Sequence, residues 1–200
     1  MSKLRLAGVI KESIVDGPGI RFVVFGQGCP HRCPGCQNPQ THDFSGGYDT
    51  TTERLLAEIR KNPMLKGITL SGGDPFVQPE AMAELAEEAH KLGLNVVTYT
   101  GYTIEELLNG LEGHPGWRRL LEQSDTLVDG RFILEQKSML LKTSGLLIPA
   151  LLWSKAGRWK SPSTTRLSSN FPEISESPAA RFAAEPLEYS RTCRKHPLRI

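Results

Sequence analysis

Short hydrophobic runs and amphipathic segments alternate along the first two thirds of the chain. The hydrophobic runs are rich in branched and aromatic side chains and end at glycine or other turn residues, which predicts buried strands. They cover residues 3–10, 20–28, 67–70, 94–100 and 125–132. The amphipathic segments repeat leucine, isoleucine and alanine at helical intervals, and they cover residues 50–62, 78–93 and 103–111. This alternation predicts an α/β fold with a parallel sheet.

Local signals mark where two of the helices begin. Thr50 precedes Glu53 by three residues, and Thr103 precedes Glu106 by three, which is the spacing of a capping box. The group that starts at Trp117 and continues with two arginines is predicted to be a solvated helix face.

Polar or glycine-rich loops follow three of the predicted strands. A cysteine-rich loop begins after residue 25, and residues 71–75 and 100–102 form the other two loops. The carboxyl ends of parallel strands lie at one edge of a sheet, and ligands bind there. The three loops are therefore predicted to converge on one site.

Composition narrows the class of protein. The chain has 200 residues, is 38% hydrophobic and carries a formal net charge of +2, with no basic stripe for a nucleic acid in its first 140 residues. The N-terminus lacks a secretory signal, and the longest apolar run, residues 139–153, is shorter than the roughly 20 residues that cross a bilayer. We expect a cytoplasmic location, where thiols stay reduced. We expect neither a membrane nor a nucleic acid as a partner.

Three cysteines, Cys29, Cys33 and Cys36, form a C-x3-C-x2-C pattern in the first loop. With His31 as a fourth ligand they would make a closed zinc site. As ligands of an iron–sulfur cube they would leave one iron open for a substrate or cofactor. A redox pair of Cys33 and Cys36 would leave Cys29 unexplained. The pattern favours the iron–sulfur cube and leaves zinc open, while the fourth cysteine, Cys193, lies far away along the chain.

Four segments carry a resemblance to a known family. They read VDGPGIRFVVFGQGCPHRCPGCQNP, LSGGDP, YTGYTIEELL and LVDGRFI, in this order. Together they resemble the activating proteins of anaerobic ribonucleoside-triphosphate reductases, which are glycyl-radical activases of the radical S-adenosylmethionine superfamily, over about residues 3–137. Gly35 stands where the wider superfamily commonly has an aromatic residue, but the CPGC form is typical of this group.

The resemblance implies a partial (βα)6-type, TIM-like barrel that binds a 4Fe-4S cluster and S-adenosylmethionine. Cys29, Cys33 and Cys36 would hold the cluster, and the amino and carboxylate groups of the cofactor would chelate the open iron. The residues implied to bind the cofactor are Gly35, Cys36, Gln37, Ser71, Gly72, Gly73 and Asp74. Reductive cleavage of the cofactor would give a 5′-deoxyadenosyl radical, which would take a hydrogen atom from a glycine of the reductase.

The same resemblance implies two partners. One is the large subunit of the reductase, which carries the glycine, and the other is a reductant such as flavodoxin or ferredoxin. Asp129 and Arg131 are weaker candidates for the rim of the site. Two alternatives stay open: another radical S-adenosylmethionine enzyme, such as a pyruvate formate-lyase-type activase or a small-molecule modifier, and a zinc-binding interaction module.

The last third of the chain departs from the pattern. Residues 1–137 are predicted to form the radical S-adenosylmethionine core, and residues 138–200 an atypical tail rich in serine, proline and arginine. The related proteins usually continue with Arg-Gly-Ser-x-Asn-Gln-Arg, which is missing here. The codons of residues 145–151, read one nucleotide on, can encode Gly-Ser-Ser-Ser-Gln-Arg. This predicts a frameshift and a disordered tail, and a lineage-specific docking arm is the alternative.

Overall fold

A seven-stranded sheet forms the centre of the described chain. The computed structural model describes residues 2–134 and 147–149, and the strands lie in the order β3-β1-β2-β4-β5-β6-β7. They are β1 (Lys3–Ser13), β2 (Arg21–Gly26), β3 (Tyr48–Thr51), β4 (Gly67–Gly72), β5 (Asn95–Tyr99), β6 (Thr126–Val128) and β7 (Leu147–Pro149).

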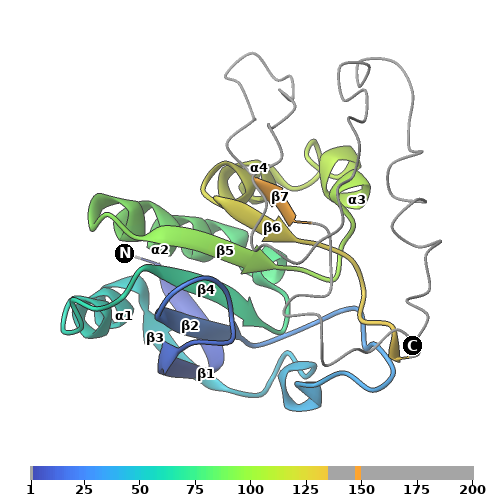
Figure 1. Cartoon of the computed structure of the whole chain (residues 1–200). Helices are drawn as coiled ribbons and strands as arrows, with labels where there is room; N and C mark the ends of the chain where they lie inside the picture. Colours follow the sequence, from blue (N-terminus) through green and yellow to red (C-terminus); the bar gives the residue numbers. More distant parts are fainter. Residues whose placement is uncertain (1, 135–146, 150–200) are drawn as a thin grey trace, which may run out of the picture. The chain divides into compact units, whose positions relative to one another are not determined.

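The four strands β2, β4, β5 and β6 run parallel to one another. Val24, Leu70, Thr98 and Leu127 are aligned in register across them. β1 pairs antiparallel with β2 and β3, and β7 pairs antiparallel with β6. The arrowheads of β4, β5 and β6 point the same way, and the loop after β2 passes on the side to which they point (Figure 1). The predicted α/β class with parallel strands is confirmed.

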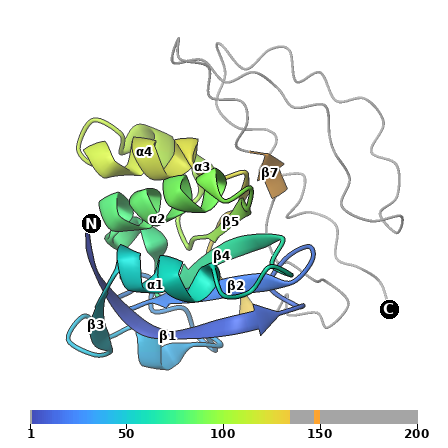
Figure 2. The same cartoon turned by 90° about the vertical axis from the view of Figure 1, so that its left-hand side faces the viewer.

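Helices cover one face of this sheet. They are α1 (Thr52–Ile59), α2 (Pro79–Lys91), α3 (Ile104–Asn109) and α4 (Pro115–Glu122), with short 3-10 helices η1 (Pro39–Thr41) and η2 (Pro75–Val77). α1 and α2 pack against strands of the sheet, and α4 packs against α2. Figure 2 shows α4, α2 and α1 one below another beside the strands.

The hydrophobic core lies between the strands and these helices. Phe22, Val24, Ile68 and Leu70 alternate along β2 and β4 with residues of the opposite face, and each is at most 1% exposed. They belong to one buried cluster with Leu85 of α2. Each such side chain stabilises the fold by about 1.5–3 kcal/mol relative to an exposed position. The core therefore fixes the strand ends that carry the three loops.

Arg21, the first residue of β2, is buried on the face of the sheet opposite the helices. This guanidinium is fully buried, and it donates from Nε to the Thr69 hydroxyl at 2.7 Å and from Nη1 to Asn95 Oδ1 at 2.7 Å. Burial lowers the pKa of Arg21 to about 10, against the opposing influence of nearby Tyr99, Asp125 and Asp16. The hydrogen bonds offset part of the cost of removing this charge from water.

The strand β3 was not predicted from the sequence. β3 has only four residues, and it directly precedes α1, so its two threonines suggested the start of the helix instead. Thr51, and not Thr50, caps α1, because the side chain of Thr51 accepts from the Arg54 N–H at 3.4 Å. The capping box of Thr103 and Glu106 at the start of α3 is confirmed.

α4 begins at Pro115 and contains the group that was predicted to be a solvated helix face. Arg118 and Arg119 are exposed, as predicted. The prediction was wrong for Trp117, because this side chain is 6% exposed and its Nε1 donates to the Phe76 carbonyl at 2.9 Å. Phe76 and Trp117 also meet edge to face, with ring centroids 5.9 Å apart. α4 therefore packs over η2, next to the loop at residues 71–75.

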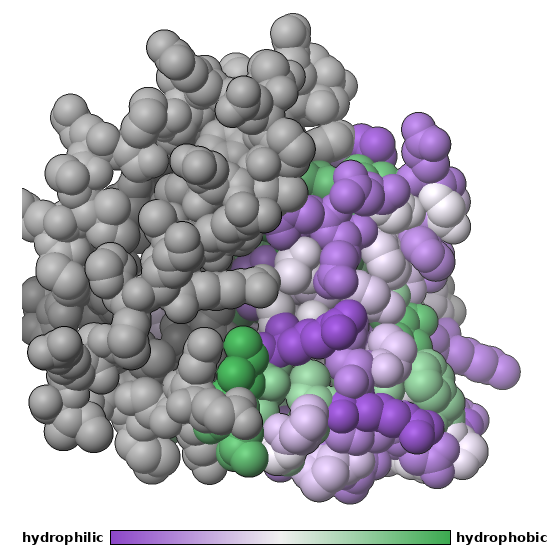
Figure 3. Space-filling model, turned by 90° about the vertical axis from the view of Figure 1, so that its right-hand side faces the viewer, coloured by the Kyte–Doolittle hydropathy of each residue, from purple (hydrophilic) through white to green (hydrophobic). Residues whose placement is uncertain are grey.

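The predicted tail lies outside the described residues, apart from β7. Two compact units are distinguished, Met1–Leu151 and Leu152–Ile200. The predicted boundary after residue 137 and the predicted frameshift stay predictions. No helix within residues 2–134 and 147–149 is long and apolar enough to span a membrane. On the face shown in Figure 3, hydrophilic residues predominate over the described part of the surface, and hydrophobic residues form separate patches.

Candidate active site

The cysteine loop begins where β2 ends, and backbone hydrogen bonds hold its base. The Gly28 N–H donates to the Thr41 carbonyl at 2.8 Å, and the Cys29 N–H donates to the His42 carbonyl at 3.3 Å. The buried side chain of Gln27 donates to the carbonyls of Gln40 and Asp43. The two ends of the loop are thus tied together beside the carboxyl end of the sheet.

The three predicted loops meet around one hollow of about 150 Å³. Its lining includes Cys29, Cys33, Cys36, Ser71, Gly72, Gly73, Thr100 and Gly101. Cys29 is 8% exposed, and the other two thiols are partly exposed. The convergence predicted from the positions of the loops is therefore observed. Tyr99, Val128 and Phe132 also line the hollow. They lie in two of the segments that carry the family resemblance, but none of them was predicted as a site residue.

The thiols line this hollow without converging on one point. Within the described residues, no three side chains of His, Cys, Asp or Glu are grouped as the ligands of a single metal ion. In an iron–sulfur cube each thiolate binds a different iron, so its ligands surround a larger body than one ion. Three thiols around one hollow fit that donor set.

Burial affects the thiol nearest the sheet. Burial raises the pKa of Cys29, and the nearby Asp74 carboxylate and Cys33 raise it too. Hydrogen bonds from the backbone at His31 and Arg32 act in the opposite direction. Because the thiolate is the form that binds metal, bound iron would supply the positive charge that this position lacks.

The two glycines at 72 and 73 allow β4 to approach the end of β2. A Cβ on Gly73 would lie 2.2 Å from the Gly28 carbonyl oxygen, and a Cβ on Gly72, where φ is +99°, would lie 2.5 Å from the Gly26 nitrogen. The Gly73 N–H donates to the Gly26 carbonyl at 2.7 Å. The glycines therefore serve first to join the two strand ends, and this junction brings Ser71, Gly72 and Gly73 to the hollow.

Asp74 is 1% exposed and bonds to residues that line the hollow. Its Oδ1 accepts from the Phe76 N–H at 3.0 Å, and its Oδ2 accepts from the Gly101 N–H at 2.9 Å. The Thr100 hydroxyl lies 3.1 Å from Oδ1 and 2.9 Å from Oδ2. The carboxylate thus joins the loop after β4 to the loop after β5. It is not among the residues that line the hollow.

The cysteine loop also reaches Asp74, through His31. His31 Nε2 lies 2.9 Å from Asp74 Oδ2, and the His31 ring meets Tyr102 edge to face with centroids 4.4 Å apart. A Cβ on Gly101 would lie 2.3 Å from His31 Cδ2, so a glycine there lets the ring approach. The imidazole nitrogen considered as a zinc ligand is therefore paired with a buried carboxylate.

The remaining predicted residues lie outside the hollow. Gly35 and Gln37 are exposed and are not part of its lining. Asp129 accepts from the Ile104 N–H at 2.8 Å, at the start of α3. Arg131 is exposed, and its Nη2 lies 3.6 Å from Glu106 Oε1.

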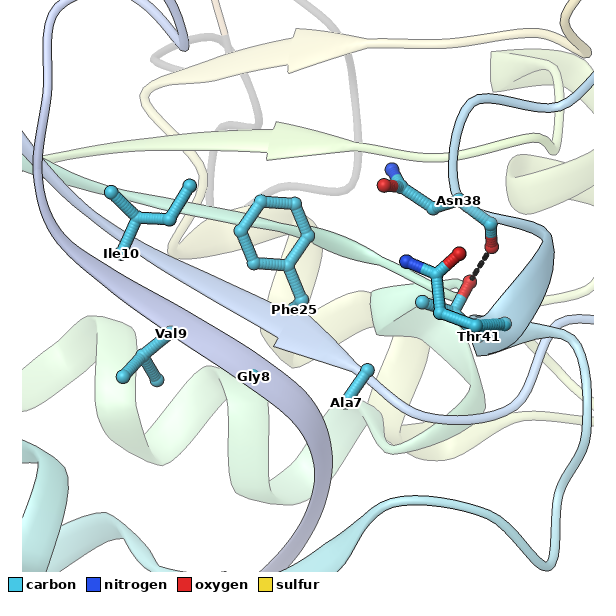
Figure 4. Close-up of a pocket in the computed structure, with 8 residues that line it drawn as sticks. Ala7, Gly8, Val9, Ile10, Phe25, Asn38 and Thr41 are labelled. Atoms are coloured by element: carbon cyan, nitrogen blue, oxygen red, sulfur yellow. Dashed lines mark hydrogen bonds between the residues drawn. The ribbon is translucent and has the colours of Figure 1, made fainter.

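A second hollow, of about 220 Å³, lies between β1, β2 and residues 38–41. Figure 4 shows Val9, Ile10 and Phe25 along it, and the Thr41 hydroxyl donating to the Asn38 carbonyl at 2.7 Å. None of its lining residues is a cysteine, a histidine or a charged residue. The first hollow is thus the better candidate for chemistry.

Comparisons with known proteins agree with this site. A family described as a 4Fe-4S single cluster domain matches residues 15–146. The anaerobic ribonucleoside-triphosphate reductase-activating protein of Salmonella typhimurium is 30% identical over 149 residues, which cover 70% of this chain and 86% of that protein. The protein of the same name from Vibrio cholerae is 33% identical over 132 residues, which cover 62% of this chain and 81% of that protein. This chain belongs to the anaerobic ribonucleoside-triphosphate reductase-activating protein family.

Two further similarities cover only about half of the compared chain. The pyruvate formate-lyase-activating enzyme of Clostridium pasteurianum is 33% identical over 130 residues, and the chain spans half the length of that enzyme. QueE from Escherichia coli superposes with a TM-score of 0.41 at 18% identity, over 50% of this chain and 54% of that one. Membership of the reductase-activating protein family confirms the prediction of a radical S-adenosylmethionine enzyme with an iron–sulfur cluster.

Proposed function

We propose that this member of the reductase-activating protein family generates a glycyl radical on an anaerobic ribonucleoside-triphosphate reductase. Cys29, Cys33 and Cys36 hold the 4Fe-4S cluster, and S-adenosylmethionine binds beside it in the hollow. The observation that carries the proposal is that three thiols of one loop line this space. The His31 nitrogen, which was considered as a fourth ligand, is paired with Asp74. An iron without a side-chain ligand is left for the cofactor.

The cluster and cofactor together supply one-electron cleavage of a carbon–sulfur bond, and the chain supplies position and shelter. Ser71, Gly72 and Gly73 line the same hollow as the thiols, where their polar groups suit the ammonium of the methionine moiety. Tyr99 and Phe132 add apolar surface to the same hollow and limit the access of water. Gly35 and Gln37, which are exposed, are proposed to contact the adenosyl part from the rim.

The target is proposed to be a glycine on a loop of the large reductase subunit. The hollow opens at the carboxyl edge of the parallel strands, so a loop of a larger protein has access to it. The reductant is proposed to be a flavodoxin or a ferredoxin, and the reaction to take place in the cytoplasm, without nucleic acid or membrane.

The test combines the anaerobically reconstituted chain with the reductase, S-adenosylmethionine and a reductant. We expect a doublet in the electron paramagnetic resonance spectrum, and no doublet with a reductase whose radical-site glycine is replaced by alanine. An intact cluster without the doublet would contradict the proposal. Cofactor cleavage with a small molecule in place of the reductase would favour a small-molecule enzyme, and a colourless protein that holds zinc would favour an interaction module.

A further inference from the structure

His42 is a residue of the cluster hollow that the sequence pattern did not indicate. Its side chain lines the hollow together with the three thiols. Its Nε2 atom is buried, and within the described residues it has no hydrogen-bond partner. It is the one buried side-chain nitrogen or oxygen of the described chain in this condition.

The backbone holds this ring beside the first cysteine. The Cys29 N–H donates to the His42 carbonyl at 3.3 Å, and the His42 N–H donates to the Pro39 carbonyl at 3.2 Å. His42 is the residue that follows η1, and η1 itself is tied to the loop base through the bond from Gly28 to Thr41. The place of His42 next to Cys29 is therefore fixed by the same bonds that close the loop.

A buried polar nitrogen without a partner destabilises the fold, and native proteins keep few of them. Two other polar side chains that line the hollow, His31 and Thr100, both bond to Asp74 and do not reach Nε2. The missing partner of Nε2 is therefore expected among the groups that bind in the hollow. Cys29, whose N–H bonds to the His42 carbonyl, is the thiol next to this ring in the backbone pairing.

We propose that His42 donates a hydrogen bond from Nε2 to a sulfur atom of the 4Fe-4S cluster, either the Cys29 thiolate or a bridging sulfide. This inference rests on the proposed function, because it requires the cluster. The sulfur atoms are negatively charged, and their charge increases on reduction, so a donor stabilises the reduced cluster more than the oxidised one. Hydrogen bonds of this kind raise the reduction potential of a cluster. A histidine bound to iron instead would occupy the position that the cofactor needs.

The test compares three variants of the anaerobically reconstituted full chain. His42→Phe keeps the ring and removes the donor, and His42→Gln restores an N–H at similar reach. His114→Phe is the matched control, because His114 is exposed and stacks on Trp117 away from the hollow. Each protein is assayed for iron and sulfide, and its cluster is titrated against a redox mediator series with electron paramagnetic resonance detection.

We expect His42→Phe to bind the full cluster and to lower the ratio of reduced to oxidised cluster about tenfold at a fixed potential. That change corresponds to a midpoint about 59 mV more negative for one electron. His42→Gln should recover most of the wild-type midpoint, and His114→Phe should keep it. In the wild-type protein labelled with nitrogen-15 histidine, pulsed resonance should show a weak coupling, as expected for a nitrogen one hydrogen bond away from the cluster.

Three results would overturn the inference. One is an unchanged midpoint in His42→Phe with a complete cluster. Another is strong nitrogen coupling in the wild type, which would mean that histidine binds iron directly. The third is loss of the cluster from both His42→Phe and His42→Gln while the chain stays folded, which would assign His42 a role in shape alone. A wild-type chain that binds no cluster would contradict the proposed function itself, and this outcome is seen before any variant is compared.

Discussion

The imidazole of His31 and the carboxylate of Asp74 form a buried pair that joins the cysteine loop to the sheet. Nε2 and Oδ2 are 2.9 Å apart, and the two side chains are 4% and 0% exposed. Asp74 also accepts from Thr100 and Gly101, so one carboxylate fastens three loops. The geometry gives Asp74 a positioning role, because its oxygen atoms are occupied by donors of the protein.

Asp74→Asn tests this role. The amide would retain the shape, but it would bring an N–H group against the donors of Phe76, Gly101 or His31. We expect a loss of about 2–3 kcal/mol in the free energy of unfolding, and less iron retained by the chain even without S-adenosylmethionine. Chemical unfolding and iron analysis after gel filtration under anoxia measure both quantities.

A second variant separates positioning from cofactor binding. His31→Phe should lower iron retention in the same way, and the double variant should lose less than the sum of the single losses, because the two residues act as one pair. If Asp74→Asn kept its iron and lost only affinity for S-adenosylmethionine, Asp74 would contact the cofactor and the positioning role would be refuted.

The three cysteines of the hollow should be individually required for the cluster. Cys29→Ser, Cys33→Ser and Cys36→Ser are each expected to abolish the visible absorption of the reconstituted protein and the cleavage of S-adenosylmethionine, because a serine oxygen is a poor ligand for these irons. Cys193→Ser is the matched control and should retain both. A cluster that survived any of the first three changes would show that the assigned thiol is not a ligand.

Gly73→Ala should disturb the junction between the first two parallel strands. The added Cβ would lie 2.2 Å from the Gly28 carbonyl oxygen, and that atom belongs to the backbone, which yields less easily than a side chain. We expect a cost of about 3 kcal/mol in stability and a loss of cluster, measured by thermal unfolding and iron analysis.

The control for this change is Gly8→Ala, because no atom lies within 4 Å of a Cβ built on Gly8. That variant should keep its melting temperature within a few degrees. Equal losses in the two variants would contradict the idea that the close approach at Gly73 is what requires a glycine.

Glu84 should make the stability of the fold depend on pH in the acid range. Its carboxylate accepts from the Ser2 and Thr52 hydroxyls at 2.6 Å each, and these bonds lower the pKa of Glu84 to about 2 from an ordinary value of 4.5. Because the folded pKa lies below the unfolded one, the contribution is complete above pH 4.5 and is lost as the pH falls towards 2.

Glu84→Gln measures this contribution. Since water reaches part of the side chain, we expect the variant to be less stable by only about 1 kcal/mol at neutral pH. The difference should shrink below pH 4.5 and disappear near pH 2. Urea unfolding of the cluster-free chain, followed by circular dichroism across this range, provides the measurement. A difference that did not change with pH would show that the carboxylate charge is not responsible.

The sequence by itself determined the type of chemistry and the order of the elements. The cluster is indicated by three cysteines in one loop and by a Gly-Gly-Asp loop after the next strand. The spacing of these ligands can be seen in the sequence because they lie within a few residues of one another. Alternating hydrophobic and amphipathic segments similarly indicate the parallel strands. β3 was not predicted because a four-residue strand is too short for a clear periodic signal. The burial of Trp117 on the eight-residue helix α4 was missed for the same reason.

Only the tertiary structure decided which side chains pair with one another around the hollow. Asp74, predicted to face the cofactor, points to His31, which lies 43 positions earlier in the sequence. His42 carries no recognisable spacing, yet its backbone pairing with Cys29 brings its ring to the hollow. Such pairings depend on how loops from separate strand ends pack against one another. The pattern of residue types along the sequence does not contain the distances between residues in different loops.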